Sequence, residues 1–153
     1  MRVSCRWEGL AVVLAEPNAA DMIRDYVEEL SPLRDVVPVN PDWPRLAALE
    51  DEGIYKLWAC RVDGTLAGFV SFFVMPHHNY AGTLLACDAG HFLAPAFRDR
   101  GRIGYRMWRS AEAALRELGV RCIMAHDNAM RPLMPFFLAL DFEPRGTLFW
   151  KVL

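Results

Sequence analysis

Residues 92–108 read FLAPAFRDRGRIGYRMW, and this stretch determines how the rest of the chain can be arranged. An apolar run stops at Pro95, a loop with two glycines follows, and an amphipathic pattern begins near Gly104. Apolar residues then recur at helical spacing as far as Leu118, and Gly119 provides a stop. The stretch therefore predicts a strand, a glycine loop and a long helix in succession.

Such a loop suits an anion, because the first backbone N–H groups of a helix are unpaired and carry partial positive charge. Full positive charges are added by Arg98, Arg100, Arg102 and Arg106. A solvated turn without a ligand is the simpler alternative. The sequence contains neither a G-x-x-x-x-G-K-[ST] loop nor a G-x-G-x-x-G loop, so P-loop and dinucleotide-binding folds are not expected.

The flanking sequence predicts further strands and helices around this unit. Expected strands span 8–16, 54–62, 65–75, 83–93 and 120–125, and two closing strands over 142–152 turn at Gly146. Expected helices begin at Asn18, with Asp21 as capping-box partner, at Asn40 and at Met130. The order predicts an α/β fold with a mixed sheet and helices on its faces, as a single domain over 1–153.

Composition narrows the functional classes. The 153 residues are 54% apolar and carry 17 Lys and Arg against 19 Asp and Glu, a net charge of −2. This apolar fraction excludes disorder, and the charge balance disfavours nucleic acid as a partner. The most apolar segment, 68–75, is far shorter than the ~20 residues of a membrane span.

The four cysteines are widely spaced, and neither a disulfide framework nor a metal motif is apparent: Cys5, Cys60, Cys87 and Cys122. Reduced thiols and a start without a signal-peptide pattern predict a cytoplasmic protein that binds no membrane. The pair His77-His78 lacks a third ligand, so no metal is expected.

The segment 92–108 resembles motif A of the GNAT N-acetyltransferase superfamily, in a form often seen in phage and bacterial members. Arg98 and Gly101 match its first Arg and first Gly, whereas Ile103 stands where the second Gly is expected and Gly104 follows it. The element order also resembles the family's, as do FFLALDFEP and TLFWKVL near the end of the chain. The resemblance implies a GNAT-like acyl-CoA N-acyltransferase fold with a mixed, mostly antiparallel central sheet.

The resemblance further implies acetyl-CoA as co-substrate and no metal. Its pyrophosphate would lie on the glycine loop and its pantetheine along the edge of the strand 83–93, with an Asn near it. The residues implied in binding are Phe92, Leu93, Arg98, Arg100, Gly101, Arg102, Ile103, Gly104, Tyr105 and Asn128.

For catalysis, the resemblance points to an acidic base on that strand, and Asp88 is the best match. His91 is a second candidate, because imidazole titrates near neutrality. Alternation places the two on opposite faces unless a bulge intervenes. The family's usual Tyr acid corresponds to Phe137, which leaves the acid unassigned, with Tyr105 and Tyr80 as substitutes.

The sequence thus predicts an enzyme that moves an acetyl group from acetyl-CoA to a primary amine of a small molecule or protein. The main alternative is a catalytically silent acyl-CoA-binding or protein-interaction module on the same fold. A nucleic-acid-binding protein that uses the arginine cluster is the third. A homodimer is common in the family, but no motif of this sequence indicates one.

Overall fold

The structure, a computed structural model, describes residues 1–31 and 33–152. Five strands form one sheet in the order β1-β2-β3-β4-β5. Their bounds are Val3–Trp7 (β1), Tyr55–Val62 (β2), Thr65–Pro76 (β3), Leu84–Leu93 (β4) and Val120–Met124 (β5). The first three pairings are antiparallel, and β4 pairs with β5 in parallel. A mixed, mostly antiparallel sheet is confirmed, although its strands differ from the predicted ones near both ends of the chain.

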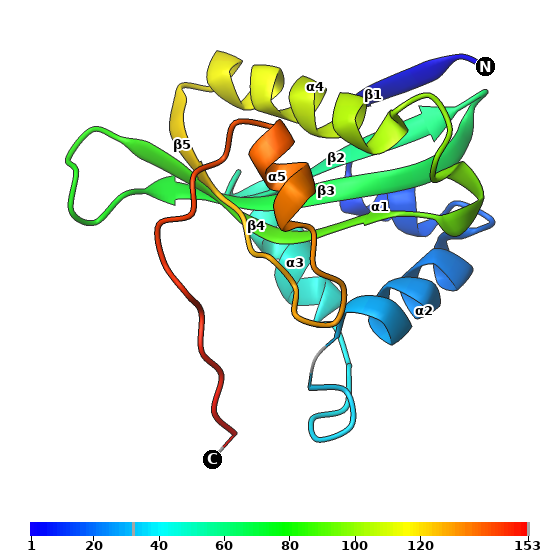
Figure 1. The fold of residues 1–153 in the computed structure, drawn as a ribbon, viewed down its shortest axis with the longest axis horizontal. Helices are drawn as coiled ribbons and strands as arrows, with labels where there is room; N and C mark the ends of the chain where they lie inside the picture. The colour runs from blue at the N-terminus through cyan, green and yellow to red at the C-terminus, as the bar shows by residue number, and fades with distance from the viewer. Residues whose placement is uncertain (32, 153) are drawn as a thin grey trace.

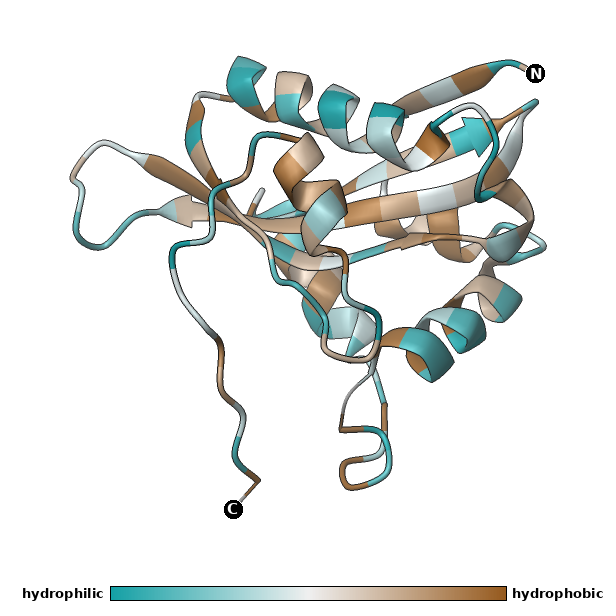
Figure 2. Ribbon diagram, viewed as in Figure 1, coloured by the Kyte–Doolittle hydropathy of each residue, from teal (hydrophilic) through white to brown (hydrophobic). Residues whose placement is uncertain are grey.

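Helices cover both faces of this sheet (Figure 1). On one face lie α4 (Ile103–Glu117) and α5 (Met134–Ala139), and on the other lie α1 (Leu10–Leu14), α2 (Ala19–Leu30) and α3 (Trp43–Asp51). Each face has its own apolar core. Phe72, Trp108 and Leu115 belong to the core under α4, while Met22 and Leu66 belong to the core under α2. Figure 2 shows the apolar colour along the central strands, between the two helical layers.

The β2–β3 hairpin forms as predicted at Asp63-Gly64. These two residues have φ of 49° and 88°, the left-handed pair that a two-residue type I′ turn requires. The turn matches the twist of the strands, so the pairing runs from Val62↔Thr65 to Tyr55↔Phe73. This hairpin fixes β3 at the centre of the sheet, with β4 beside it.

The strand predicted over 8–16 is wrong. The first strand is β1, and residues 10–14 form the short helix α1, in which Leu10 and Val13 are buried while Val12 is exposed. That spacing of three is helical, and a continuous apolar run such as LAVVLA does not distinguish a strand from a helix by periodicity.

Of the next two predicted helix starts, the one at Asn18 is confirmed, since α2 begins directly after it at Ala19, whereas the one at Asn40 differs. The predicted capping box at Asn18 does not form, because its amide Nδ2 donates to Leu66 O (2.9 Å). Helix α3 begins at Trp43, since Asp42 rather than Asn40 caps it by accepting from the Arg45 N–H (2.9 Å).

The last predicted helix and the closing strands differ more. Helix α5 begins four residues later than predicted, because the loop before it is held by its own hydrogen bonds, such as Leu133 N–H to Asp127 Oδ1 (2.6 Å). Residues 142–152 form no strand and run away from the sheet (Figure 1). Pro144 lacks an N–H, and residues 147–152 find no strand to pair with in the described chain. The side chains of Phe149 and Trp150 are therefore exposed, at 86% and 67%.

Candidate functional site

The site begins where β4 and β5 part. Their parallel pairing covers Leu84 to Cys87 on β4 and ends at Cys87↔Met124. The second half of β4, from Asp88 to Leu93, pairs with β3 on one edge and with no strand of the described chain on the other. The structure therefore has an open strand edge directly before the glycine loop.

A bulge in β4 brings the two candidate bases together. Register shifts between Ser71↔Gly90 and Phe72↔Asp88, which leaves Ala89 without a partner. Because of this extra residue, Asp88 and His91 lie on the same face of the sheet. Asp88 Oδ2 lies 2.9 Å from His91 Nδ1, and the side chains are only 4% and 12% exposed.

The hydrogen bonds of Asp88 indicate which nitrogen of His91 donates when the carboxylate is ionised. Asp88 Oδ1 accepts from the Gly90 N–H (2.9 Å), so Oδ2 remains to face the imidazole. An ionised carboxylate only accepts hydrogen bonds, so His91 Nδ1 is the donor and Nε2 carries the lone pair in the neutral ring. Nε2 is buried, and no other group in the described chain is bonded to it.

Aromatic rings hold the imidazole of His91 in place. It meets Trp108 of α4 and Phe137 of α5 edge-on, with ring centroids 5.4 Å and 5.7 Å away. On the other face of β4, Tyr26 of α2 crowds Gly90, where an added Cβ would lie 2.8 Å from the Tyr26 hydroxyl. Burial and, second, the nearby Asp88 raise the pKa of Tyr26.

The hydrogen bonds between β3 and β4 determine which backbone N–H and C=O groups face the open edge. The Ala94 N–H donates to Ala67 O on β3 (2.9 Å), so alternation turns the polar groups of Leu93 and His91 away from β3. The carbonyl of Leu93 is already used, because Arg98 Nε donates to it (2.7 Å). The N–H groups of His91 and Leu93 therefore face the open edge.

The glycine loop follows as predicted. It contains a left-handed run, with φ of 56° at Asp99, 57° at Gly101 and 57° at Arg102, and α4 starts at Ile103. No side chain caps this helix, which leaves its first N–H groups to the backbone and to ligands. Ile103 is buried in the core, so only its main chain faces the loop surface, and Gly104 leaves room beside Leu93.

The arginines of the loop differ in what they contact. Arg98 donates to Glu29 of α2 (3.0 Å) and lies over the Phe92 ring, so it fastens the end of β4 to α2. Arg102 lies 4.9 Å over the Tyr105 ring, and both Arg102 and Arg100 are exposed. Arg100 and Arg102 are thus the cations that remain available to an anion on the loop.

Sequence reasoning missed Glu29, which also pairs with Arg131 after β5 and so links the two sides of the strand opening. Glu29 follows Tyr26 by about one turn on α2, and this spacing was the only sequence pattern that placed it near the site. Asn128 lies beside this link, where its Nδ2 donates to Leu30 O (2.7 Å).

The substitutes considered for the acid lie elsewhere. The Tyr105 hydroxyl accepts from Arg109 Nε (3.1 Å) on α4, and Tyr80 is exposed in the β3–β4 loop, at the opposite end of β4 from His91. The same loop carries His77 and His78. Within residues 1–31 and 33–152, no group of three metal-ligating side chains is present.

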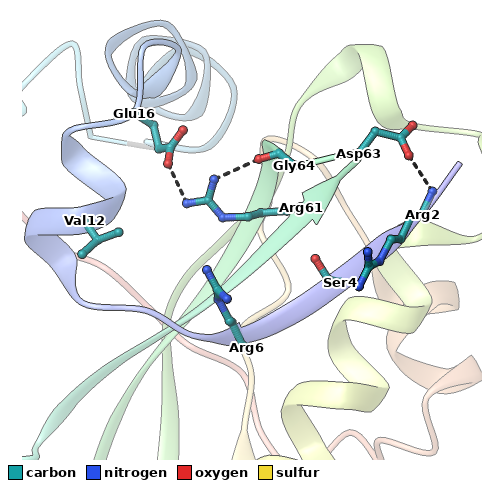
Figure 3. Close-up of a pocket in the computed structure, with 8 residues that line it drawn as sticks. All are labelled: Arg2, Ser4, Arg6, Val12, Glu16, Arg61, Asp63 and Gly64. Atoms are coloured by element: carbon teal, nitrogen blue, oxygen red, sulfur yellow. Dashed lines mark hydrogen bonds and ion pairs between the residues drawn. The ribbon is translucent and has the colours of Figure 1, made fainter.

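A hollow of about 770 Å³ lies at the other edge of the sheet, among β1, β2 and α1 (Figure 3). Its central cation, Arg61, is held by Glu8 and Glu16, each at 2.7 Å. The strand β3 separates this hollow from the open edge of β4. In the described part of the chain, no helix has the length and apolar character needed to cross a membrane.

Known proteins share the fold that carries the open edge and its loop. The model of the acetyltransferase (GNAT) family matches residues 20–142. No curated protein sequence matches the chain. Among solved structures, an aminoglycoside acetyltransferase from an uncultured soil metagenomic sample, in complex with sisomicin, has a TM-score of 0.72 at 13% identity, over 99% of this chain and 96% of its own.

Two further solved structures share the fold. The ribosomal-protein-alanine N-acetyltransferase of Brucella melitensis biovar Abortus 2308 has a TM-score of 0.68 at 16% identity, over 99% of this chain and 98% of its own. The glucosamine-6-phosphate N-acetyltransferase of Arabidopsis thaliana has a TM-score of 0.68 at 11% identity, over 99% of both chains. The fold is thus the same across proteins named for quite different acceptors.

Proposed function

Because the chain belongs to the GNAT acetyltransferase family, whose model covers residues 20–142, we propose that it transfers the acetyl group of acetyl-CoA to a primary amine of a small molecule or a protein by direct attack. The observation that carries this proposal is the buried Asp88–His91 pair in the half of β4 that lacks a second neighbouring strand, with His91 Nε2 unbonded. The named acceptors of the similar structures include an aminoglycoside and a protein alanine, which supports an amine acceptor here.

Acetyl-CoA would lie along the open edge. Its pantetheine amides would pair with the outward N–H groups of β4, as an added strand would, and its pyrophosphate would lie on the first turn of α4. Arg100 and Arg102 would neutralise the pyrophosphate, while Gly101 and Gly104 allow the main chain to approach it closely. Arg98 would contribute indirectly to acetyl-CoA binding, because it holds the end of β4 in place by donating to Leu93 O.

His91 would act first as the base. The amine must lose a proton as its nitrogen attacks the thioester carbonyl carbon, and Nε2 has the free lone pair. Asp88 would keep the other proton on Nδ1 and stabilise the imidazolium that forms. The N–H of Leu93 would donate to the carbonyl oxygen as negative charge develops there.

The same imidazolium would then serve as the acid. When the carbon–sulfur bond breaks, the departing thiolate of CoA takes the proton from Nε2, which restores the neutral ring. With His91 as the acid, a tyrosine would not be needed at position 137, where the Phe137 ring packs against His91 instead. No second proton donor is then required.

The test compares His91→Gln and Asp88→Asn with the wild type in an assay of thiol release from acetyl-CoA across a panel of primary amines. We expect kcat to fall about 10²–10⁴-fold for His91→Gln, with the KM for acetyl-CoA little changed. His77→Gln is the matched control, because His77 lies in the β3–β4 loop. A His91→Gln enzyme that retains most of its activity would contradict the assignment.

The silent acyl-CoA-binding module remains as a second candidate function, favoured by the absence of a tyrosine at Phe137. Calorimetry with CoA separates the two. Binding of CoA together with background thiol release in wild type and variants alike would favour the module, whereas no binding at millimolar CoA would refute both.

A further inference from the structure

Two of the four cysteines face each other across the edge of the sheet. Cys5 of β1 pairs in register with Cys60 of β2, and both side chains belong to the face covered by α4. Cys60 is fully buried and Cys5 is half-buried. Both are free thiols in the structure.

The hydrogen-bond pattern identifies the kind of pair that they form. The Glu8 N–H donates to Leu57 O (3.0 Å) and the Asp63 N–H donates to Arg2 O (2.9 Å). Glu8 and Arg2 are therefore at hydrogen-bonded positions of the β1–β2 ladder, and every second residue between them shares that state. Cys5 lies three positions from each, so Cys5 and Cys60 form a non-hydrogen-bonded pair.

This position suits a disulfide. The Cα atoms of a non-hydrogen-bonded antiparallel pair lie about 4.5 Å apart, and their side chains are closer than at the alternate positions. A disulfide needs Cα atoms roughly 4.4–6.8 Å apart. The two sulfurs can therefore be joined with little movement of either strand.

The surroundings give the two thiols different roles. A hydrogen bond from the Cys60 thiol, supported by Ser110 and by the positive charge of Arg106, lowers the pKa of Cys5 to about 7 against the opposing effect of burial. The same hydrogen bond, together with burial, raises the pKa of Cys60. Cys5 is thus the partly exposed thiol that ionises more readily, and Cys60 is the buried thiol behind it.

We propose that Cys5 and Cys60 are a reversible dithiol–disulfide site, oxidised by small hydroperoxides. The Cys5 thiolate attacks a peroxide oxygen, the O–O bond breaks, and Cys5 becomes a sulfenic acid while hydroxide leaves. The Cys60 sulfur then attacks Cys5 Sγ, so that the S–S bond forms and the S–O bond breaks. The departing oxygen takes the Cys60 proton and leaves as water. The two thiols together supply the two electrons that reduce the peroxide.

The bond would fasten the edge strand β1 to β2 and close a loop that contains α1, α2 and α3. Closing a loop of this length restricts the unfolded chain, so oxidation should raise the thermal midpoint on the order of 10 °C. The disulfide does not depend on acetyl transfer, and its readouts are covalent structure and Tm.

The experiment oxidises the full chain with equimolar hydrogen peroxide, blocks remaining thiols with iodoacetamide, and maps tryptic peptides without reduction. Cleavage after Arg2, Arg6, Lys56 and Arg61 isolates the two cysteines on the short peptides 3–6 and 57–61. We expect these two peptides to be cross-linked with the loss of two hydrogen atoms, reversibly with dithiothreitol, and the Tm to rise together with the cross-link.

Three variants test whether the cross-link joins Cys5 to Cys60. The double variant Cys87→Ser, Cys122→Ser should still form the cross-link and show the same rise in Tm. Cys60→Ala should lose the cross-link and the rise in Tm, and its Cys5 should remain as a sulfenic acid that dimedone traps. If Cys60→Ala does not fold, Cys5→Ser should likewise lose the cross-link and the rise in Tm. Oxidation of Cys5 alone in the wild type, or a cross-link through Cys87 or Cys122, would overturn the proposal.

Discussion

Single residues determine where charge can be buried in this protein. The carboxylate of Glu8 is only 4% exposed, yet it is ionised between two arginines, with Arg61 Nη2 at 2.7 Å and Arg6 Nε at 2.9 Å. A buried charge is tolerated only when it is paired and hydrogen-bonded, and Glu8 meets both conditions. It thereby anchors the start of α1 to the β1–β2 edge.

Replacement of Glu8 by Gln should therefore destabilise the fold by roughly 2 kcal/mol at pH 7, because Arg61 and Arg6 lose their shared partner. Hydrogen bonding from Arg61 holds the pKa of Glu8 below its ordinary value of 4.5. The stabilisation is thus complete above that value and is lost as pH falls through the lowered pKa.

Urea unfolding at pH 7 and at pH 4 measures this difference. The difference in free energy of unfolding between wild type and Glu8→Gln should be largest at pH 7 and smaller at pH 4. Glu117→Gln is the control, since it changes the same charge at an exposed position of α4. A gap that widens as pH falls would contradict a lowered pKa for Glu8.

At the scale of elements, the close approach of β3 and β4 determines the shape of the open edge. Gly68 lies opposite Leu93, and a Cβ on it would come within 2.4 Å of Phe92 O. The backbone there cannot move aside as a flexible side chain could. Glycine is therefore required at position 68 for β4 to present its outer edge in register.

Gly68→Ala should cost roughly 1–3 kcal/mol of stability through this backbone clash. Because it displaces the main chain at Leu93, whose N–H is the proposed donor to the thioester carbonyl oxygen, it should also lower kcat and raise the KM for acetyl-CoA. Thermal unfolding and steady-state kinetics check the two effects. Gly146→Ala, which meets nothing within 4 Å, should leave both unchanged. If Gly68→Ala has wild-type stability and KM, β4 does not depend on this contact.

Some elements of the fold could be predicted from the sequence, and others could not. The hairpin at Asp63-Gly64 and the loop before α4 could be predicted, because turn chemistry and helical periodicity are local. Asp88 and His91 could be named as candidate bases, but their pairing could not be predicted, since it depends on a bulge that no local sequence pattern indicates. Helix α1 and the segment 142–152 were predicted wrongly, because the outcome there depends on tertiary partners rather than on propensity.

Across the whole molecule, the fold is complete without the end of the chain. Phe142 packs against Trp108 and Phe137 in the core under α4, with ring centroids 5.8 Å and 5.3 Å away. Beyond it, Leu148 and Phe149 are exposed at 57% and 86%. The core that carries the site therefore closes at Phe142.

Truncation after Glu143 should consequently leave the Tm within about 2 °C of the wild type, because exposed residues contribute little free energy of unfolding. Truncation after Leu140 is the comparison, since it also removes Phe142 and should lower the Tm by several degrees. Differential scanning calorimetry of the three chains decides this. A large loss from the shorter deletion would mean that the terminal segment packs in solution.

The exposed position of Trp150 has an optical consequence. Trp58 and Trp108 are 7% and 2% exposed, whereas Trp150 is 67% exposed. An indole in water emits at longer wavelength and is quenched by acrylamide, whereas an indole in an apolar core is shielded from the quencher. Trp150 is the most exposed of the five tryptophans, so a blue shift with concentration or with an added partner that is absent in Trp150→Phe would report that this segment has become covered.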